Sequence, residues 1–175
     1  TSGCEAQGLY HLGKLAAMEN RIEQTVGLME AAIAKSTAYA PPFEELAQYY
    51  MQERRVTDAM RVLRAGVDAD DTRDRLVVML GRILSMSSDP DVRDGPAAVA
   101  LLERAAIRTK RADPAILVIL AAGYAESGRF DLAITAAEEA IAKTAGMTVS
   151  EESMRRIREQ LDGYRRSQPA RDPAL

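Results

Sequence analysis

The sequence predicts an all-α fold in which helix pairs stack side by side into a solenoid. One observation is a repeat at a spacing of 34 residues, at which Leu12, Leu46 and Leu80 are each followed by Gly or Ala. A repeat of this length is typical of helix–turn–helix units that bury their apolar faces against their neighbours. The other observation is composition. Ala, Leu, Arg and Glu are abundant and aromatic residues make up only 5% of the chain, which favours helix.

Four repeats are expected, at about residues 6–39, 40–73, 74–112 and 114–147. The apolar periodicity predicts eight helices, over residues 6–19, 22–35, 42–53, 56–68, 71 or 72 to 87, 96–110, 114–126 and 130–144. The clearest start signal is Asp113 as N-cap followed by Pro114 at the first helical position, because the N–H that proline lacks would have no helical partner there. Turns inside the repeats are expected near Asn20, at residues 54–55 and at residues 127–129.

The third repeat differs from the others in the long connection between its helices, residues 88–95. Insertions in repeat proteins map to loops and often to a binding edge; a solvated insertion without a role is the alternative. A last helix is expected over residues 150–167, where it caps the end of the stack. We interpret its many arginines as a solvated face. Residues 168–175 contain two prolines and are expected to form an extended or disordered tail.

The apolar and small positions of these repeats resemble the tetratricopeptide repeat (TPR). The most complete copy is the fourth, with Leu117, Leu120, Ala121, Tyr124, Gly128, Phe130, Ala133 and Ala140. The second copy has Phe43, Leu46, Ala47, Tyr50, Ala59 and Leu63. Gly66 departs from the pattern, since Ala is usual at that position. The resemblance implies a TPR-type right-handed α-solenoid with a C-terminal capping helix. Residues 89–105 and the Arg-rich last helix resemble the C-terminal TPR arrays of some large bacterial proteins.

The resemblance also implies where a partner binds. In TPR proteins the first helix of each repeat lines a concave groove, at set distances from the conserved Leu. Carried onto this chain, the groove positions are Tyr10, Lys14, Met18, Glu44, Gln48, Met51, Val78, Arg82, Met86, Val118 and Ala122. The positions beside them include Ala17, Gln52, Ser85, Ala125 and Glu126. The Asn residues with which some family members hold a partner's carboxylate are missing, so binding of chaperone tails is not supported.

Two features of these groove positions bear on binding. One is a ladder of three methionines, Met18, Met51 and Met86. It is either an adaptable binding surface or ordinary packing between neighbouring helices. The other is the helix over residues 115–125, which has no polar face, and a helix that is apolar all round is usually buried all round. Its groove side, with Val118 and Ala122, is left to a partner, to the chain's own tail or to solvent.

No catalytic residue, cofactor or metal site is predicted. His11 is the only histidine and Cys4 the only cysteine, so the residues do not compose a catalytic triad, a metal site or an internal disulfide. The acidic stretch at residues 68–74 lacks the Gly and Glu of a calcium loop and is interpreted as caps and turns. A formal net charge of −3 gives no electrostatic case for nucleic acid. The apolar runs are too short to span a bilayer.

These observations favour a non-catalytic scaffold that binds a protein or peptide in the groove, or that serves as a subunit of a larger assembly. Two alternatives stay open. One is an envelope lipoprotein with a lipid on Cys4 that assists assembly of a pilus or outer-membrane component, a hypothesis based on the run Ser-Gly-Cys at residues 2–4. The other is the docking tail of a larger enzyme. The compartment, cytoplasm or periplasm, stays open too, as does self-association into a homo-oligomer.

Overall fold

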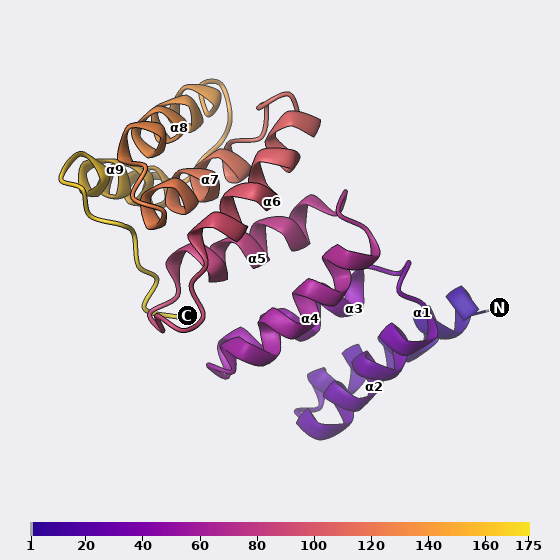
Figure 1. Ribbon diagram of the computed structural model, residues 1–175. Helices are drawn as coiled ribbons and strands as arrows, with labels where there is room; N and C mark the ends of the chain where they lie inside the picture. The colour runs from indigo at the N-terminus through magenta and orange to yellow at the C-terminus, as the bar shows by residue number, and fades with distance from the viewer. Residues whose placement is uncertain (1) are drawn as a thin grey trace. The chain divides into compact units, whose positions relative to one another are not determined.

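The computed structural model describes residues 2–175, and within them it contains nine α-helices and one isolated β-bridge. The helices are α1 Ser2–Met18, α2 Ile22–Lys35, α3 Pro41–Gln52, α4 Val56–Ala69, α5 Asp74–Met86, α6 Gly95–Arg108, α7 Pro114–Glu126, α8 Phe130–Lys143 and α9 Glu151–Arg165. Figure 1 shows consecutive helices paired as hairpins, α1 with α2, α3 with α4 and α7 with α8, while α9 packs on α8. The prediction of an all-α fold of helix pairs with a final single helix is confirmed.

The chain divides into two compact units, one ending at Leu76 and the other running from Val77 to Leu175, with the boundary inside α5. The core of the first unit is built by apolar residues of α3 and α4, among them Phe43, Leu46 and Leu63, which are fully buried. In the second unit the almost wholly apolar α7 lies between α6 and α8. Burial of α7 on several sides matches its lack of a polar face.

Three of the hairpins close with the same turn. The second residue after the first helix adopts a left-handed conformation, with φ of 56° at Asn20, 57° at Arg54 and 73° at Gly128. The next residue donates its N–H at 2.8–2.9 Å to a carbonyl in the last turn of the helix: Arg21 to Ala16, Arg55 to Tyr50 and Arg129 to Tyr124. This is the way in which helices commonly end. The third repeat lacks the turn, and its chain continues into the insertion.

Tyrosines of the second and fourth repeats connect neighbouring hairpins. Tyr50 of α3 donates its hydroxyl to Glu30 of α2 at 3.4 Å, and Tyr124 of α7 donates to Glu103 of α6 at 2.7 Å. A guanidinium lies over each ring, Arg55 at 4.6 Å and Arg129 at 4.8 Å from the centroid. Burial, with the bond to Glu103, raises the pKa of Tyr124 to about 12. These tyrosines therefore stay neutral donors at ordinary pH.

Small residues let the helices approach each other. A Cβ at Gly13 would lie 3.0 Å from Met29 Cε of α2, and one at Gly81 would lie 2.7 Å from a methyl of Leu102 in α6. Packing also explains why position 66, which departs from the TPR pattern, is glycine rather than alanine. A Cβ there would lie 2.7 Å from a methyl of Leu76, so the alanine that the pattern favours does not fit without displacing this buried side chain.

Several helix ends differ from the predicted ones. Helix α1 begins at Ser2 rather than at residue 6, and α6 ends at Arg108 rather than at residue 110. Helix α5 begins at Asp74 rather than at residue 71 or 72, because the Asp70 carboxylate accepts the Thr72 N–H at 3.0 Å and holds a turn there. The last helix spans Glu151–Arg165 rather than 150–167, with Ser150 as its N-cap. Residues 168–175 are not a disordered tail: they return to the end of α5 and form the β-bridge with Ser87 through Asp172.

The close contact at Gly95 provides a test of the packing. A Cβ at this first residue of α6 would lie 2.9 Å from the backbone nitrogen of Ser127 and 3.0 Å from the backbone carbonyl carbon of Glu126. Backbone atoms cannot rotate away, so we expect Gly95→Ala to cost about 1–3 kcal/mol, seen as a lower midpoint of urea denaturation. The control is Gly27→Ala in α2, where a Cβ meets nothing within 4 Å and a gain of about 0.5–1 kcal/mol is expected. Equal midpoints for the two variants would contradict the contact.

Candidate functional site

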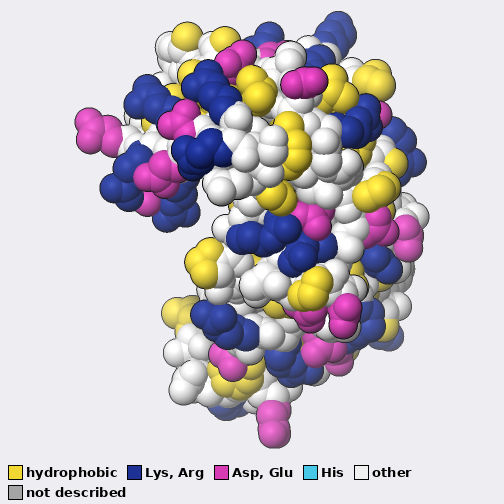
Figure 2. Space-filling view, turned by 60° about the vertical axis from the view of Figure 1, so that its left-hand side comes forward, with side chains coloured by type: hydrophobic (Ala, Val, Ile, Leu, Met, Phe, Trp, Pro, Cys, Tyr) yellow, Lys and Arg dark blue, Asp and Glu magenta, His cyan; other side chains and the backbone are white. Residues whose placement is uncertain are grey.

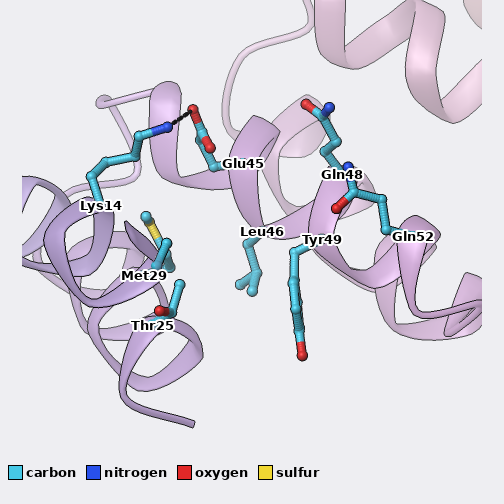
Figure 3. A pocket seen from close by; sticks show the side chains of 9 residues that line it. Lys14, Thr25, Met29, Glu45, Leu46, Gln48, Tyr49 and Gln52 are labelled. Carbon is cyan, nitrogen blue, oxygen red and sulfur yellow. Dashed lines mark hydrogen bonds and ion pairs between the residues drawn. The ribbon is translucent and has the colours of Figure 1, made fainter. Parts of the chain in front are cut away.

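A pocket of about 360 Å³ opens between α1, α2 and α3 in the first unit (Figure 3). It is lined by Lys14, Ala17, Thr25, Met29, Glu45, Leu46, Gln48, Tyr49 and Gln52. Met29 and Leu46 are buried and supply apolar surface. Figure 3 shows Lys14 beside Glu45, with the amides of Gln48 and Gln52 further along α3. The pocket thus combines an apolar base with a polar rim.

One carboxylate organises the charged end of this pocket. Glu45 Oε1 accepts from Lys14 Nζ at 2.8 Å and from the Tyr10 hydroxyl at 3.4 Å. The hydrogen bond to Glu45 raises the pKa of Lys14. Burial, followed by the charge of Glu45, raises the pKa of Tyr10. At neutral pH the rim therefore presents the charged ammonium of Lys14, and the neutral phenol of Tyr10 bonds to the same carboxylate from outside the lining.

Only some of the predicted groove residues of the first unit lie at this pocket. Lys14 and Gln48 line it, and Tyr10 is joined to it through Glu45. Glu44 forms an ion pair of 2.8 Å with Arg75, and Met51 is half-buried outside the lining. Met18, the last residue of α1, is 83% exposed and is not among the lining residues.

The three methionines of the possible ladder differ in exposure. Met18 stands in solvent, so it neither lines the pocket nor packs between helices, whereas Met86 is buried. A methionine surface of the adaptable kind needs side chains that are exposed together. The contributions of Thr25 and Met29, which come from the second helix of the hairpin, were not predicted.

A second pocket, of about 760 Å³, lies within the second unit. Arg82 and Met86 of α5 and Ile119 of α7 line it, together with residues of α9 and of the returning chain end. Its lining residues from α9 onward are Arg156, Glu159, Gln160, Gly163, Arg166, Gln168, Pro169, Ala170, Arg171, Asp172, Pro173 and Ala174. Residues of the chain's own tail therefore line this pocket beside Ile119 of α7, whereas Val118 and Ala122, which form the groove side named from the sequence, are not among its lining residues.

The remaining predicted groove residues of the second unit are less accessible than expected. Ala122 is 1% exposed, so its side chain is not available to a partner, contrary to the prediction. Val78 and Val118 are half-buried and lie outside the lining of this pocket. Arg82 is a predicted groove position whose side chain binds another part of the same chain: its Nε donates to Asp172 Oδ2 at 2.8 Å.

The sequence did not indicate that the insertion after α5 is a structured platform. Arg93 donates to Glu126 Oε1 at 2.8 Å and to the Ser87 carbonyl at 2.9 Å, and Asp94 N–H donates to the Leu84 carbonyl at 2.8 Å. These bonds hold the insertion against the ends of α5 and α7. An arginine within a run of Asp, Pro and Gly was the only available signal.

Within residues 2–175 no group of three or more His, Cys, Asp or Glu is placed to hold a metal ion. His11 has its ring edge-on to Tyr10 with centroids 5.4 Å apart, and Cys4 is exposed in α1. None of the nine helices of this part of the chain is long and apolar enough to cross a membrane. On the face in Figure 2, basic and acidic side chains are interspersed with single hydrophobic ones.

Two solved structures are similar to the chain over most of its length. A crystal structure of MamA protein matches with a TM-score of 0.65 at 18% sequence identity, covering 93% of this chain and 89% of that one. A MamA mutant matches with a TM-score of 0.55 at 19% identity, covering 95% and 98%. The chain is a TPR-like α-solenoid. No family model and no curated protein sequence matches it. At this identity the likeness establishes the fold alone.

The link between Glu45 and Lys14 can be tested by titration. We expect Glu45→Gln to lower the pKa of Lys14 toward its ordinary value, because the raising hydrogen bond to a carboxylate is lost. NMR of the lysine Nζ groups between pH 8 and 12 measures this. The pair stabilises the fold below the ordinary lysine pKa and ceases to do so as pH rises through the raised one. Both side chains are about 40% exposed, so the stability change is under about 1 kcal/mol.

The neighbouring carboxylate is the matched control. Glu44 is the neighbour of Glu45 in the sequence, but its carboxylate pairs with Arg75. Glu44→Gln should therefore leave the pKa of Lys14 as it is in the unchanged chain. Identical titrations of Lys14 in the two variants would show that Glu45 does not hold the ammonium.

Proposed function

We propose that the chain is a non-catalytic scaffold of the TPR family, related to the C-terminal arrays of large bacterial proteins, and that it binds an extended segment of a partner polypeptide. The pocket between α1, α2 and α3 is the observation that carries this proposal. It lies where Lys14 and Gln48, on the first helices of two successive hairpins, reach the same space. The TPR-like fold supports the proposal, since stacked hairpins form extended binding surfaces.

The polar groups of the pocket fit a polypeptide backbone. The amides of Gln48 and Gln52 each offer a donor and an acceptor, which is what an extended chain with unpaired N–H and C=O groups needs. Lys14 adds a cation whose position is set by Glu45. Met29 and Leu46 provide apolar surface for one side chain of the ligand. A volume of about 360 Å³ is within the range of small binding sites.

The charge distribution also supports a protein ligand. Lysines, arginines and carboxylates alternate on the face in Figure 2 without a broad field of one sign, and the formal net charge is −3. Nucleic acid binding draws its affinity from basic surfaces that neutralise several phosphates. A mixed surface with a partly apolar pocket is typical of protein–protein recognition.

Site-specific photocrosslinking in an extract of the source cell tests the proposal. A photoreactive residue in place of Gln48 should capture a defined protein, and the same residue in place of Arg64, exposed on α4, should not. Adding Lys14→Glu should reduce the Gln48 crosslink at least tenfold, because a fixed cation of the pocket becomes an anion. Capture that is the same from both positions, or insensitive to Lys14→Glu, would refute a ligand in this pocket.

A further inference from the structure

The last eight residues of the chain pack against the end of α5 and the insertion that follows it. Figure 1 shows the chain leaving α9 and returning to the end of α5, beside the insertion that leads to α6. We refer to residues 168–175 as the return segment. It borders the second pocket through most of its length, and Leu175 at its end is 5% exposed. The contacts of this segment therefore report what the surface beneath it recognises.

The first set of contacts is made by the main chain. Asp172 N–H donates to the Met86 carbonyl at 2.8 Å, and Asp172 pairs with Ser87 as a parallel β-bridge. Ser88 N–H donates to the Leu175 carbonyl at 3.0 Å, and the Ser88 hydroxyl donates to the same oxygen. A peptide that adds to exposed backbone groups in this way gains affinity without regard to its sequence.

The second set of contacts selects side chains. Asp172 receives two hydrogen bonds from the Arg82 guanidinium, one from Nε at 2.8 Å. Arg171 Nη1 lies 2.7 Å from Glu126 Oε2. Leu175 is buried at the end of a turn closed by its own N–H to the Asp172 carbonyl at 3.0 Å. The surface thus contacts three side chains of the segment. Glu126 pairs with its arginine, Arg82 binds the adjacent carboxylate, and the aliphatic side chain three residues after the carboxylate is buried.

The platform is held independently of the return segment. Arg93 joins the insertion to Glu126 and to the Ser87 carbonyl, and Asp94 N–H donates to the Leu84 carbonyl. The Asp94 side chain also caps α6 by accepting the Ala97 N–H at 2.9 Å. The insertion that carries the backbone groups of Ser87 and Ser88 is thus tied down by bonds that do not involve the segment, which is what a receptor surface requires.

We propose that this surface is a second peptide-binding site. Its ligand is an extended partner segment with an Arg-Asp pair and a large aliphatic residue three positions after the Asp. The return segment occupies the site until such a partner displaces it. The proposal deepens the scaffold function proposed above and rests on it. Tethering gives the return segment an effective concentration on the order of millimolar. A partner must therefore bind more tightly than the segment does, or be held nearby through another contact.

The test uses the segment itself as a probe. A fluorescein-labelled, C-terminally amidated peptide of residues 167–175 is titrated into two full-length chains and followed by fluorescence anisotropy. One is the unchanged chain, and the other carries Asp172→Ala and Leu175→Ala, which remove the two side-chain anchors of the return segment. We expect the released chain to bind the peptide at least tenfold more tightly. Equal affinities, or no binding to the released chain at millimolar peptide, would overturn the proposal.

Charge reversal identifies the surface. Adding Arg82→Glu to the released chain should weaken the peptide at least tenfold, and a peptide with Lys in place of Asp172 should regain the affinity. Arg64→Glu, an equal charge change on α4 in the first unit, is the control and should leave binding unaltered. If Arg82→Glu and Arg64→Glu behave alike, the peptide does not bind at Arg82 and the assignment is wrong.

A measurement on the unchanged chain does not depend on the variants folding. Excess unlabelled peptide should shift the backbone amide resonances of Asp172 and Leu175 toward those of a free chain, while those of Gln48 and Gln52 stay in place. Unmoved resonances of the return segment would overturn displacement. A dimer in light scattering that the peptide dissociates would also overturn it, because the occupant would then be the segment of a second copy. No natural partner enters these tests, so their failure leaves the Gln48 crosslinking result unaffected.

Discussion

The close approach of paired helices at glycine and alanine positions is the constraint on which the other features of this chain depend. A Cβ at Gly13 or Gly81 would meet a side chain of the second helix at 3.0 Å or less, and Ala47 and Ala121 are fully buried at the equivalent positions. Lys14 and Gln48 directly follow Gly13 and Ala47 in the chain, so their side chains project about 100° around the helix from the contact with the second helix. From there they reach the pocket that opens between α1, α2 and α3.

Local signals made most of the helices predictable from the sequence. The apolar period and the turn at Asn20 placed α2 at its observed bounds, and Asp113 with Pro114 marked the start of α7, where the Asp113 carboxylate accepts the Ala115 N–H at 2.8 Å. The start of α5 was missed because Asp70 forms a side-chain turn with Thr72. Short polar side chains compete with the helix for backbone N–H groups, and the period of apolar residues does not report that competition.

The candidate site was less predictable, for two physical reasons. The family pattern describes the first helix of each repeat, so it found Lys14 and Gln48 but not Thr25 and Met29, which reach the pocket from the second helix. The return segment depends on a contact between Arg82 and Asp172, 90 residues apart. Pairs at that separation leave no periodic trace, and a chain end with two prolines has the composition of a free tail.

The energetics of the return segment favour its exchange over permanent docking. Arg82 keeps a side chain that is 42% exposed, so water can solvate its guanidinium when Asp172 leaves. Glu126 is only 15% exposed, and a carboxylate that buried needs a cation; Arg93 provides one at 2.8 Å whether or not Arg171 is present. The main cost of release is the exposure of Leu175, about 1.5–3 kcal/mol for an aliphatic side chain of this size. A contact in which Glu126 keeps its cation and Arg82 passes from Asp172 to water, with one apolar anchor, is suited to being made and broken repeatedly.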